Sequence, residues 1–241
     1  MLNNIKISSS EAYVGLFTFL ENATVRNLVF GSSCSFINTH SSTNPYVGAL
    51  VGFYKGCTHT QIIENIINMA SVTYNGNIEY PGLVGGIIGY ISSGTHENCV
   101  RNSVNYGTIT HSGTSTSWVY LGGIIGTSSG SRGTEYLHIQ NCINYGTFIV
   151  SGSSKNIAIG GIVGDSSYGT YYENCVNAGK ISITKTPTEG SYKGGIAGRI
   201  NTNTFIEYCH YTNDAGASSL YECMKSTLQT AQRGLPVPQK P

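Results

Sequence analysis

The sequence predicts an all-β, single-domain parallel β-helix, a solenoid of about six coils with three short strands per coil and a C-terminal capping helix. Three short motifs recur in a fixed order along the 241 residues, with a period of 34 to 38 residues. Each motif is a short segment between Gly and Asn, which is typical of strands, because a helix needs a longer run with 3.6-residue periodicity. Such repeats bury their apolar faces only by stacking, so the periodicity indicates a solenoid.

The first motif is a short apolar strand held between glycines, as in Gly-Gly-Ile-Ile-Gly at residues 85–89. The five complete copies end at Gly52, Gly89, Gly126, Gly164 and Gly198. A degenerate copy at residues 14–18 makes six. A phosphate-binding loop would occur once and carry Lys beside Ser or Thr. The recurring glycines therefore indicate tight bends and close backbone approach.

The second motif places Asn at a fixed corner after a strand, as in Ile139-Gln140-Asn141-Cys142. Asn tolerates the left-handed backbone conformation, and its side-chain amide can bond to the equivalent amide one coil away. We therefore predict an asparagine ladder of Asn27, Asn65, Asn102, Asn141 and Asn174. The sixth copy carries Tyr208 in place of Asn.

The third motif is a turn followed by a strand, as in Asn105-Tyr106-Gly107-Thr108-Ile109-Thr110. Similar segments begin at Asn144 and Asn177. This strand is the third of each coil. Equivalent strands of neighbouring coils are expected to pair about 4.8 Å apart.

The seven cysteines contain no CxxC pair and are odd in number, which argues against a zinc site and a complete disulfide framework. Cys142, Cys175 and Cys209 occupy one repeat position, where other coils carry Leu, Ile or Ser. Free Cys packs as a small hydrophobic residue. We expect these thiols to lie in the core.

The end of the chain departs from the repeat. Residues 1–212 hold the predicted coils, residues 213–234 a linker and the capping helix, and residues 235–241 an extended tail. Between Ser219 and Gln232 the apolar residues recur at helical spacing, and Ser219 with Glu222 matches a capping box. A helix there would cover the open end of the solenoid.

Composition limits the partners. Charged residues make up 10% of the chain, and the net charge is +1 with no Lys/Arg cluster, so we predict no nucleic-acid binding. The sequence has no run of 18 apolar residues and no apolar signal segment in residues 1–10. We therefore expect no membrane insertion.

One pair of carboxylates could serve catalysis. Parallel β-helices include polysaccharide hydrolases and lyases, and glycoside hydrolysis needs two carboxylates about 5 to 10 Å apart. Glu173 and Glu207 share a position in consecutive coils, but Arg26, Arg101 and Gln140 interrupt that row, which is typical of a solvated surface. We assign no catalytic, metal-binding or cofactor-binding residues and expect no cofactor. We predict that the protein is not an enzyme, with a polysaccharide-degrading enzyme as the alternative.

Exposed aromatic side chains are the candidate binding residues. Segments rich in Gly, Ser, Thr and Tyr separate the motifs, for instance 92–96, 128–135 and 152–156. Aromatic rings on such a rim can stack on sugars or on protein partners. The candidates are Tyr46, Tyr80, Trp118, Tyr120, Tyr168 and Tyr192. An ice-binding solenoid is a further alternative, but only Thr108-Ile109-Thr110 matches the Thr-x-Thr face that it requires.

The Gly-Gly-Ile-x-Gly and Asn-Cys-x-Asn-x-Gly motifs resemble the GLUG-motif repeats of large secreted and surface proteins of bacteria and protists. The likeness covers roughly residues 2–230. It implies a pectin-lyase-like β-helix with an adhesive or structural role at the cell surface or outside the cell. It also implies that host or matrix glycans or proteins are the partners, and that the chain is a module of a longer protein.

Overall fold

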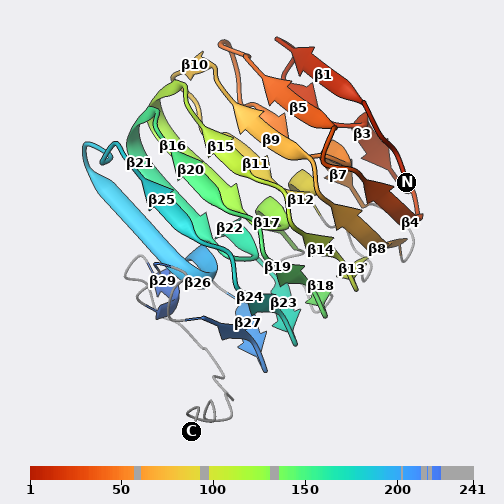
Figure 1. The fold of residues 1–241 in the computed structure, drawn as a ribbon. Helices are drawn as coiled ribbons and strands as arrows, with labels where there is room; N and C mark the ends of the chain where they lie inside the picture. Colours follow the sequence, from red (N-terminus) through yellow and green to blue (C-terminus); the bar gives the residue numbers. More distant parts are fainter. Residues whose placement is uncertain are drawn as a thin grey trace, which may run out of the picture.

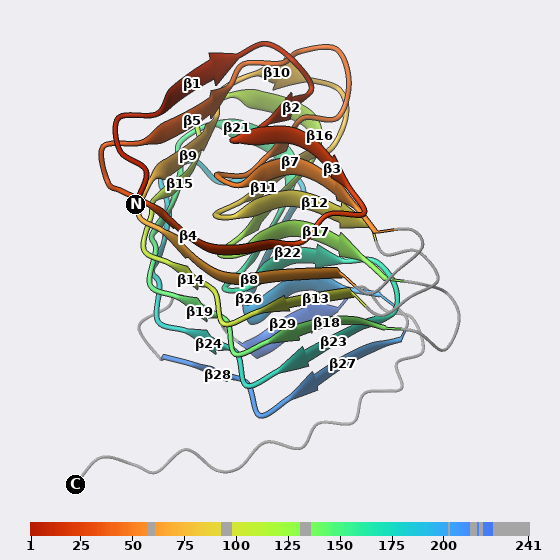
Figure 2. The ribbon, with the colours of Figure 1, turned by 90° about the vertical axis from the view of Figure 1, so that its right-hand side faces the viewer.

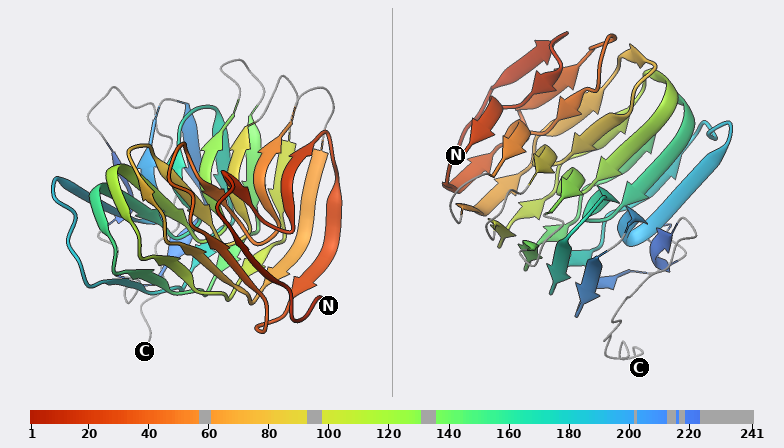
Figure 3. Two further views of the ribbon diagram at one scale, coloured as in Figure 1. Left: turned by 90° about the horizontal axis from the view of Figure 1, so that it is seen from above. Right: turned by 180° about the vertical axis from the view of Figure 1, so that it is seen from behind.

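Figure 1 shows the fold in a computed structural model, which describes residues 1–56, 61–92, 98–130, 136–201, 203–212, 216 and 219–223. These residues form a parallel β-solenoid of about five turns, where the repeats predicted about six coils. Three sheets run along the stack (Figures 2 and 3), and no described residue lies in a helix. The all-β solenoid fold is thus confirmed for the described residues.

One sheet contains six strands. Its order is β1 (Lys6–Ser9), β5 (Ser35–Asn38), β9 (Ser71–Tyr74), β15 (Ile109–His111), β20 (Phe148–Val150) and β25 (Ile181–Ile183). Alternate side chains point into the core, where Phe36, Val72, Ile109 and Phe148 stack in register and are fully buried. This sheet contains the strands predicted from the third motif.

The largest sheet contains thirteen strands and is folded into two arms. The first arm contains β2 (Tyr13–Val14), β6 (Tyr46–Val47), β11 (Gly82–Gly85), β16 (Thr114–Gly122) and β21 (Ser153–Gly160). The second arm contains β3 (Phe17–Glu21), β7 (Val51–Lys55), β12 (Ile88–Ser92), β17 (Ile125–Ser129) and β22 (Val163–Ser166). Strand β26 (Gly190–Ile200) pairs with both arms, β10 (Asn77–Ile78) pairs with β16, and β29 (Ser219–Cys223) pairs with β26.

The third sheet contains ten strands, nine on one path and β4 (Val25–Phe30), which pairs with β8 at the centre of that path. The path is β27 (Thr204–Glu207), β23 (Thr170–Glu173), β18 (Leu137–Gln140), β13 (Asn98–Arg101), β8 (Gln61–Asn68), β14 (Val104–Asn105), β19 (Ile143–Asn144), β24 (Val176–Asn177) and β28 (His210–Tyr211). Figure 2 shows β4, β8, β13, β18, β23 and β27 following one another down the stack.

The glycine motif forms the bend between the two arms. A Cβ atom at Gly122 would lie 1.7 Å from the carbonyl oxygen of Ile125, across the bend in the same coil. A Cβ atom at Gly123 would lie 2.0 Å from the carbonyl oxygen of Gly161 in the next coil and 2.5 Å from the side chain of Asn144. No side chain larger than hydrogen fits at these positions. The prediction of tight bends and close backbone approach is therefore confirmed.

A buried asparagine ladder runs through the stack where each third-motif turn begins. Asn68, Asn105, Asn144 and Asn177 are fully buried, and each side-chain amide donates to the side-chain oxygen of the next at 2.8, 2.9 and 2.9 Å. The same oxygens accept the backbone N–H two residues further on. Tyr211 takes the next position in the stack, so the Nδ2 atom of Asn177 has no hydrogen-bond partner among the described residues.

The asparagines predicted to form the ladder occupy a different, exposed corner. Asn27, Asn65, Asn102, Asn141 and Asn174 have φ angles between 52° and 59°, which is the left-handed region. Asn65 donates to Asn27 at 2.8 Å and Asn141 donates to Asn102 at 3.2 Å, but all five side chains face solvent. The left-handed residue breaks the alternation of the strand, so Asn102 points outward and Ser103 inward. The buried ladder is therefore formed by asparagines other than those predicted.

Cys142, Cys175 and Cys209 are free, buried thiols in one column of the core, as the repeat predicted. The backbone N–H of Cys175 donates to the sulfur of Cys209 at 3.4 Å. Burial raises the pKa of the Cys175 thiol well above its ordinary value. The Cys175 thiol therefore stays protonated and packs as a small hydrophobic residue.

The predicted capping helix is wrong where the structure describes it. Ser219–Cys223 form strand β29, which pairs with β26 at the end of the folded sheet. An unpaired strand edge offers backbone donors and acceptors that a helix cannot use, and a short segment gains more from pairing with them than from helical spacing. Residues 224–234 and the predicted tail at 235–241 lie outside the described residues.

Candidate functional site

Two rows of side chains cover the outer surface of the folded sheet, one on each arm. The first-arm row is in register through the stack and contains Tyr13, Tyr46, Leu83, Tyr120, Ala158 and Tyr192. The second-arm row contains Phe19, Phe53, Tyr90, Thr127, Asp165 and Arg199. We call the aromatic members of both rows, together with Trp118 on β16, the aromatic seam.

The two rows contact each other because the bend brings the arms together. A Cβ atom at Gly89 would lie 2.4 Å from a backbone nitrogen of β6, so only glycine permits this approach. Ring centroids of Tyr46 lie 5.6 Å from Phe53 and 5.2 Å from Tyr90 across the two arms. Tyr13 stacks on Tyr46 at 4.9 Å, and Phe53 stacks on Tyr90 at 5.1 Å. The rings thus form a continuous surface over several coils.

At the C-terminal end of the seam, aromatic rings surround an ion pair. Trp118 lies 5.6 Å from Tyr120 and 5.4 Å from Tyr192, between ring centroids. The guanidinium of Arg199 lies 4.8 Å from the Trp118 ring and 4.9 Å from the Tyr120 ring, which is cation–π geometry. Arg199 also donates to the buried carboxylate of Asp165. This end of the seam therefore combines ring faces with fixed polar groups.

The seam has its own apolar packing outside the main core. Leu83, Tyr120 and Ala158 lie on the outer surface of the sheet but are at most 6% exposed, because half-buried rings cover them. Burial raises the pKa of Tyr120 above its ordinary value. Burial, with the neighbouring phenols, raises the pKa of Tyr46 to about 12. These tyrosines therefore stay neutral and can donate hydrogen bonds at neutral pH.

The structure brings together four of the six aromatic residues predicted from the sequence. Tyr46, Trp118, Tyr120 and Tyr192 belong to the seam. The remaining two are Tyr80, which is 49% exposed, and Tyr168, in the connection between β22 and β23. The candidate rim segments at 93–96 and 131–135 lie outside the described residues.

Sequence reasoning missed the seam residues on the second arm. Phe19, Phe53 and Tyr90 each directly follow the last residue of a glycine motif, and Thr127, Asp165 and Arg199 follow in the later coils. First-arm residues stand two positions before the motif, as Tyr120 does before Gly122. Both rows therefore recur at fixed positions relative to the glycine motif, and the sequence alone could have shown this. The fold was needed to show that they face each other.

One polar residue of the second-arm row has no side-chain partner among the described residues. Thr127 lies between Tyr90 and Asp165 in the second-arm row and is 5% exposed. Its Oγ1 atom has no hydrogen bond to any described residue. A buried hydroxyl usually finds a partner, so a group without one is a place where a ligand atom can bind.

The carboxylate pair lies on the outer face of the ten-stranded sheet. Glu173 and Glu207 are register partners, and Gln140 donates to Glu173 at 2.9 Å. Glu64, in the same row, forms ion pairs with an arginine on either side, each at 3.2 Å. Burial, followed by a hydrogen bond with Glu207, raises the pKa of Tyr171 to about 12. The row is a half-buried surface ladder, as the interrupting Arg and Gln residues predicted.

The outer face of the six-stranded sheet is the one considered for ice binding. Its central outward row contains Ser8, Ile37, Thr73, Thr110, Ile149 and Ser182. Hydroxyl-bearing and purely aliphatic side chains are mixed in this row. The face therefore lacks a regular Thr-x-Thr array.

No family model matches the chain, and neither a curated protein nor a solved structure matches it. Within the described part of the chain, no helix is long and apolar enough to cross a bilayer. The same residues contain no group of three or more His, Cys, Asp or Glu side chains that could hold a metal ion. We take the aromatic seam as the candidate binding surface, because it places aromatic rings beside an ion pair and a buried hydroxyl.

Proposed function

We propose that this protein is a non-catalytic binding module that holds an extended glycan along the aromatic seam. The observation that carries the proposal is the arrangement of the seam along the stack. Rings around Tyr46 contact one another across both arms, those around Trp118 form a second group, and Leu83 packs between the two groups. Aromatic rings supply flat apolar area, and tyrosine adds a polar hydroxyl, a combination that suits sugar rings with both C–H faces and hydroxyl groups.

The repeat of the solenoid favours a linear ligand. Equivalent positions recur along the axis at each coil, about 4.8 Å apart, so the seam offers contacts at successive positions along a line. A chain of repeating sugar units matches such a surface better than a compact ligand does. At the C-terminal end, Asp165, Arg199 and the unpartnered hydroxyl of Thr127 supply the few polar groups that fix the orientation of a ligand.

The carboxylate ladder supports a non-catalytic role. Gln140 donates to Glu173, and the preceding carboxylate of the row, Glu64, forms ion pairs with two arginines on the outer sheet face. General acid catalysis by a carboxyl group needs a site that keeps it protonated near neutral pH, usually an apolar pocket. A polysaccharide-degrading enzyme is the second candidate, because Glu173 and Glu207 are register partners. Release of sugar from any bound glycan would favour that candidate.

The resemblance to GLUG-motif repeats supports a place for this module at the cell surface or outside the cell, as part of a longer adhesive or structural protein. Glycans of the host or matrix are then the natural partners.

A polysaccharide and oligosaccharide array tests the proposal. Trp118→Ala and Tyr90→Ala each remove a seam ring, and we expect at least a tenfold loss of affinity for the glycan that binds best, which corresponds to about 1.4 kcal/mol. The matched control is Tyr145→Ala, which removes an exposed ring stacked on Tyr106 at 5.1 Å outside the seam. Equal losses in seam and control variants would contradict the proposal.

A further inference from the structure

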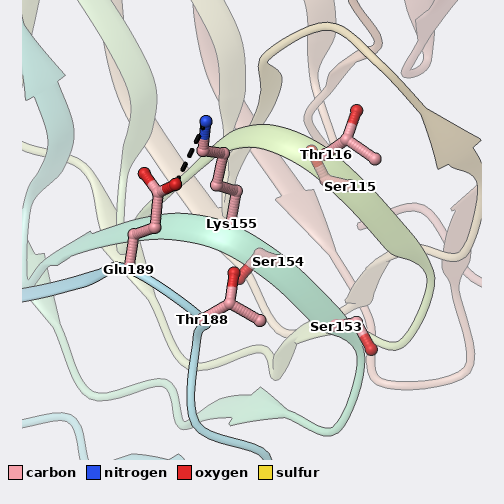
Figure 4. A pocket seen from close by; sticks show the side chains of 7 residues that line it. All are labelled: Ser115, Thr116, Ser153, Ser154, Lys155, Thr188 and Glu189. Atoms are coloured by element: carbon pink, nitrogen blue, oxygen red, sulfur yellow. Dashed lines mark ion pairs between the residues drawn. The ribbon is translucent and has the colours of Figure 1, made fainter.

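A small pocket opens where β16 and β21 begin, close to the C-terminal half of the seam (Figure 4). Its volume is about 320 Å³. Its lining includes Ser115, Thr116, Ser154, Lys155, Thr188 and Glu189. Ligand pockets of roughly 300 to 1,000 Å³ are typical, so this one has room for a single small ring.

A β-bulge forms one wall of the pocket. Ser115 pairs with Ser154, and Trp118 pairs with Asn156, so two residues of β16 face one residue of β21. The backbone N–H of Ser117 donates to the Oγ atom of Ser115 at 3.1 Å, which holds the bulge. Bulges redirect side chains and are frequent beside functional sites. Here the bulge places Thr116 at the pocket.

The pocket contains a buried hydroxyl without a partner. Ser154 is 3% exposed, and its Oγ atom forms no hydrogen bond to any described residue. The backbone of the same residue is satisfied, since its carbonyl oxygen accepts the N–H of Thr188 at 3.0 Å. A buried hydroxyl that stays unpaired costs free energy unless a ligand or water completes it. The Oγ atom of Ser154 is therefore the polar group of this lining residue whose hydrogen bond the described residues leave unmade.

The other polar side chains of the pocket include both hydrogen-bond donors and hydrogen-bond acceptors. Lys155 and Glu189 point toward each other and form an ion pair at 3.1 Å (Figure 4). Thr116 and Thr188 add hydroxyl groups that can donate or accept. The pocket therefore has no net charge and presents both kinds of hydrogen-bonding group. Such a set suits a neutral ligand whose hydroxyl groups also both donate and accept.

We infer that this pocket binds one unit of a neutral hexose, as a second site beside the aromatic seam. The inference goes beyond the proposed function and does not rest on it, because no ring of the seam lines the pocket. A chain held along the seam and a hexose held in the pocket are bound by different residues. Substitutions can therefore disrupt binding at one site and leave binding at the other site unchanged.

Isothermal titration of the folded protein with the methyl glycosides of glucose, galactose and mannose tests the inference. We expect at least one of them to bind with a stoichiometry of one. The double variant Lys155→Met, Glu189→Gln should weaken that binding at least tenfold. Both side chains are about half exposed, at 47% and 55%, so the fold is retained.

Ser154→Ala separates a ligand role from a structural role. It removes the unpartnered hydroxyl, so the melting temperature should stay the same or rise while the affinity for the hexose falls. A residue with only a structural role would give a lower melting temperature and unchanged affinity. The inference would be overturned if none of the three glycosides bound. It would also be overturned if the pocket variants bound the hexose as tightly as the unmodified protein does.

Failure of this inference and failure of the proposed function are distinguishable. Tyr90→Ala should weaken binding of a long glycan and leave hexose binding unchanged. The Lys155 and Glu189 variants should weaken hexose binding, whether or not a long glycan binds the seam.

Discussion

Asn144→Ala should destabilise the protein far more than Asn141→Ala, although the two residues lie three positions apart in the same coil. Asn144 makes four side-chain hydrogen bonds, to Asn105 and Asn177 at 2.9 Å each and to the backbone N–H and carbonyl of Gly146 at 3.1 and 3.3 Å. Each such bond contributes about 1 kcal/mol net. Because Asn105 and Asn177 keep other bonds, we expect a loss of about 3 to 5 kcal/mol in the free energy of unfolding.

Asn141 provides the matched control. Its side chain is exposed and donates a single hydrogen bond, to Asn102 at 3.2 Å. Its φ of 53° makes alanine unfavourable by about 1 to 2 kcal/mol. Asn141→Gly should recover most of that loss, since glycine adopts this conformation freely.

Urea unfolding followed by circular dichroism measures both variants. The midpoint should fall for each, with an unchanged slope if the extent of the unfolding unit is preserved. Equal midpoints for Asn144→Ala and Asn141→Ala, or a cost below about 1 kcal/mol for Asn144→Ala, would refute the assignment of the buried ladder.

Three further predictions concern single positions. Tyr208→Asn should raise the free energy of unfolding by about 0.5 to 1 kcal/mol, because Tyr208 holds a φ of 52° where the other coils carry Asn; a lower midpoint in urea would contradict this. Burial lowers the pKa of His111 from 6.5 to about 4, so the unfolded chain binds its proton first and stability falls by about 3 kcal/mol as the pH drops from 6.5 to 4. His111→Phe should flatten that part of the pH profile of the unfolding midpoint, and an unchanged profile would exclude His111 as its source. Gly123→Ala should cost more than about 3 kcal/mol or prevent folding, whereas Gly82→Ala, whose added Cβ meets nothing closer than 3.4 Å, should be tolerated; similar midpoints would show that the bend has room.

The repeat allowed the fold to be predicted, but it left the inward and outward positions ambiguous. Four coils carry two asparagines three residues apart, as Asn141 and Asn144, and both recur with the same period. The residue two positions after the buried asparagine distinguishes it from the exposed one. Gly146 donates its N–H to the oxygen of Asn144, and the glycine pair of the motif leaves room beside that side chain.

The seam could be predicted only in part for a related reason. The positions two before and one after the glycine motif are fixed by the sequence, and several of them are aromatic. Whether these rings face each other depends on how sharply the bend folds the sheet, which is a property of backbone packing around Gly89 and its equivalents. The helix predicted from Ser219 failed because the open edge of β26 offered stronger pairing than local propensity.

Trp118 makes the most direct measurement of the proposed function possible, because it is the only tryptophan of the chain and lies in the seam. Its fluorescence, with iodide as a collisional quencher, can be followed while the best glycan of the array is added. We expect saturating glycan to shield Trp118 from iodide, and we expect Tyr90→Ala to shift the titration to at least tenfold higher glycan concentration while Tyr145→Ala does not. Quenching that is unchanged at glycan concentrations where binding is complete would contradict the proposal, since the glycan would then occupy another surface.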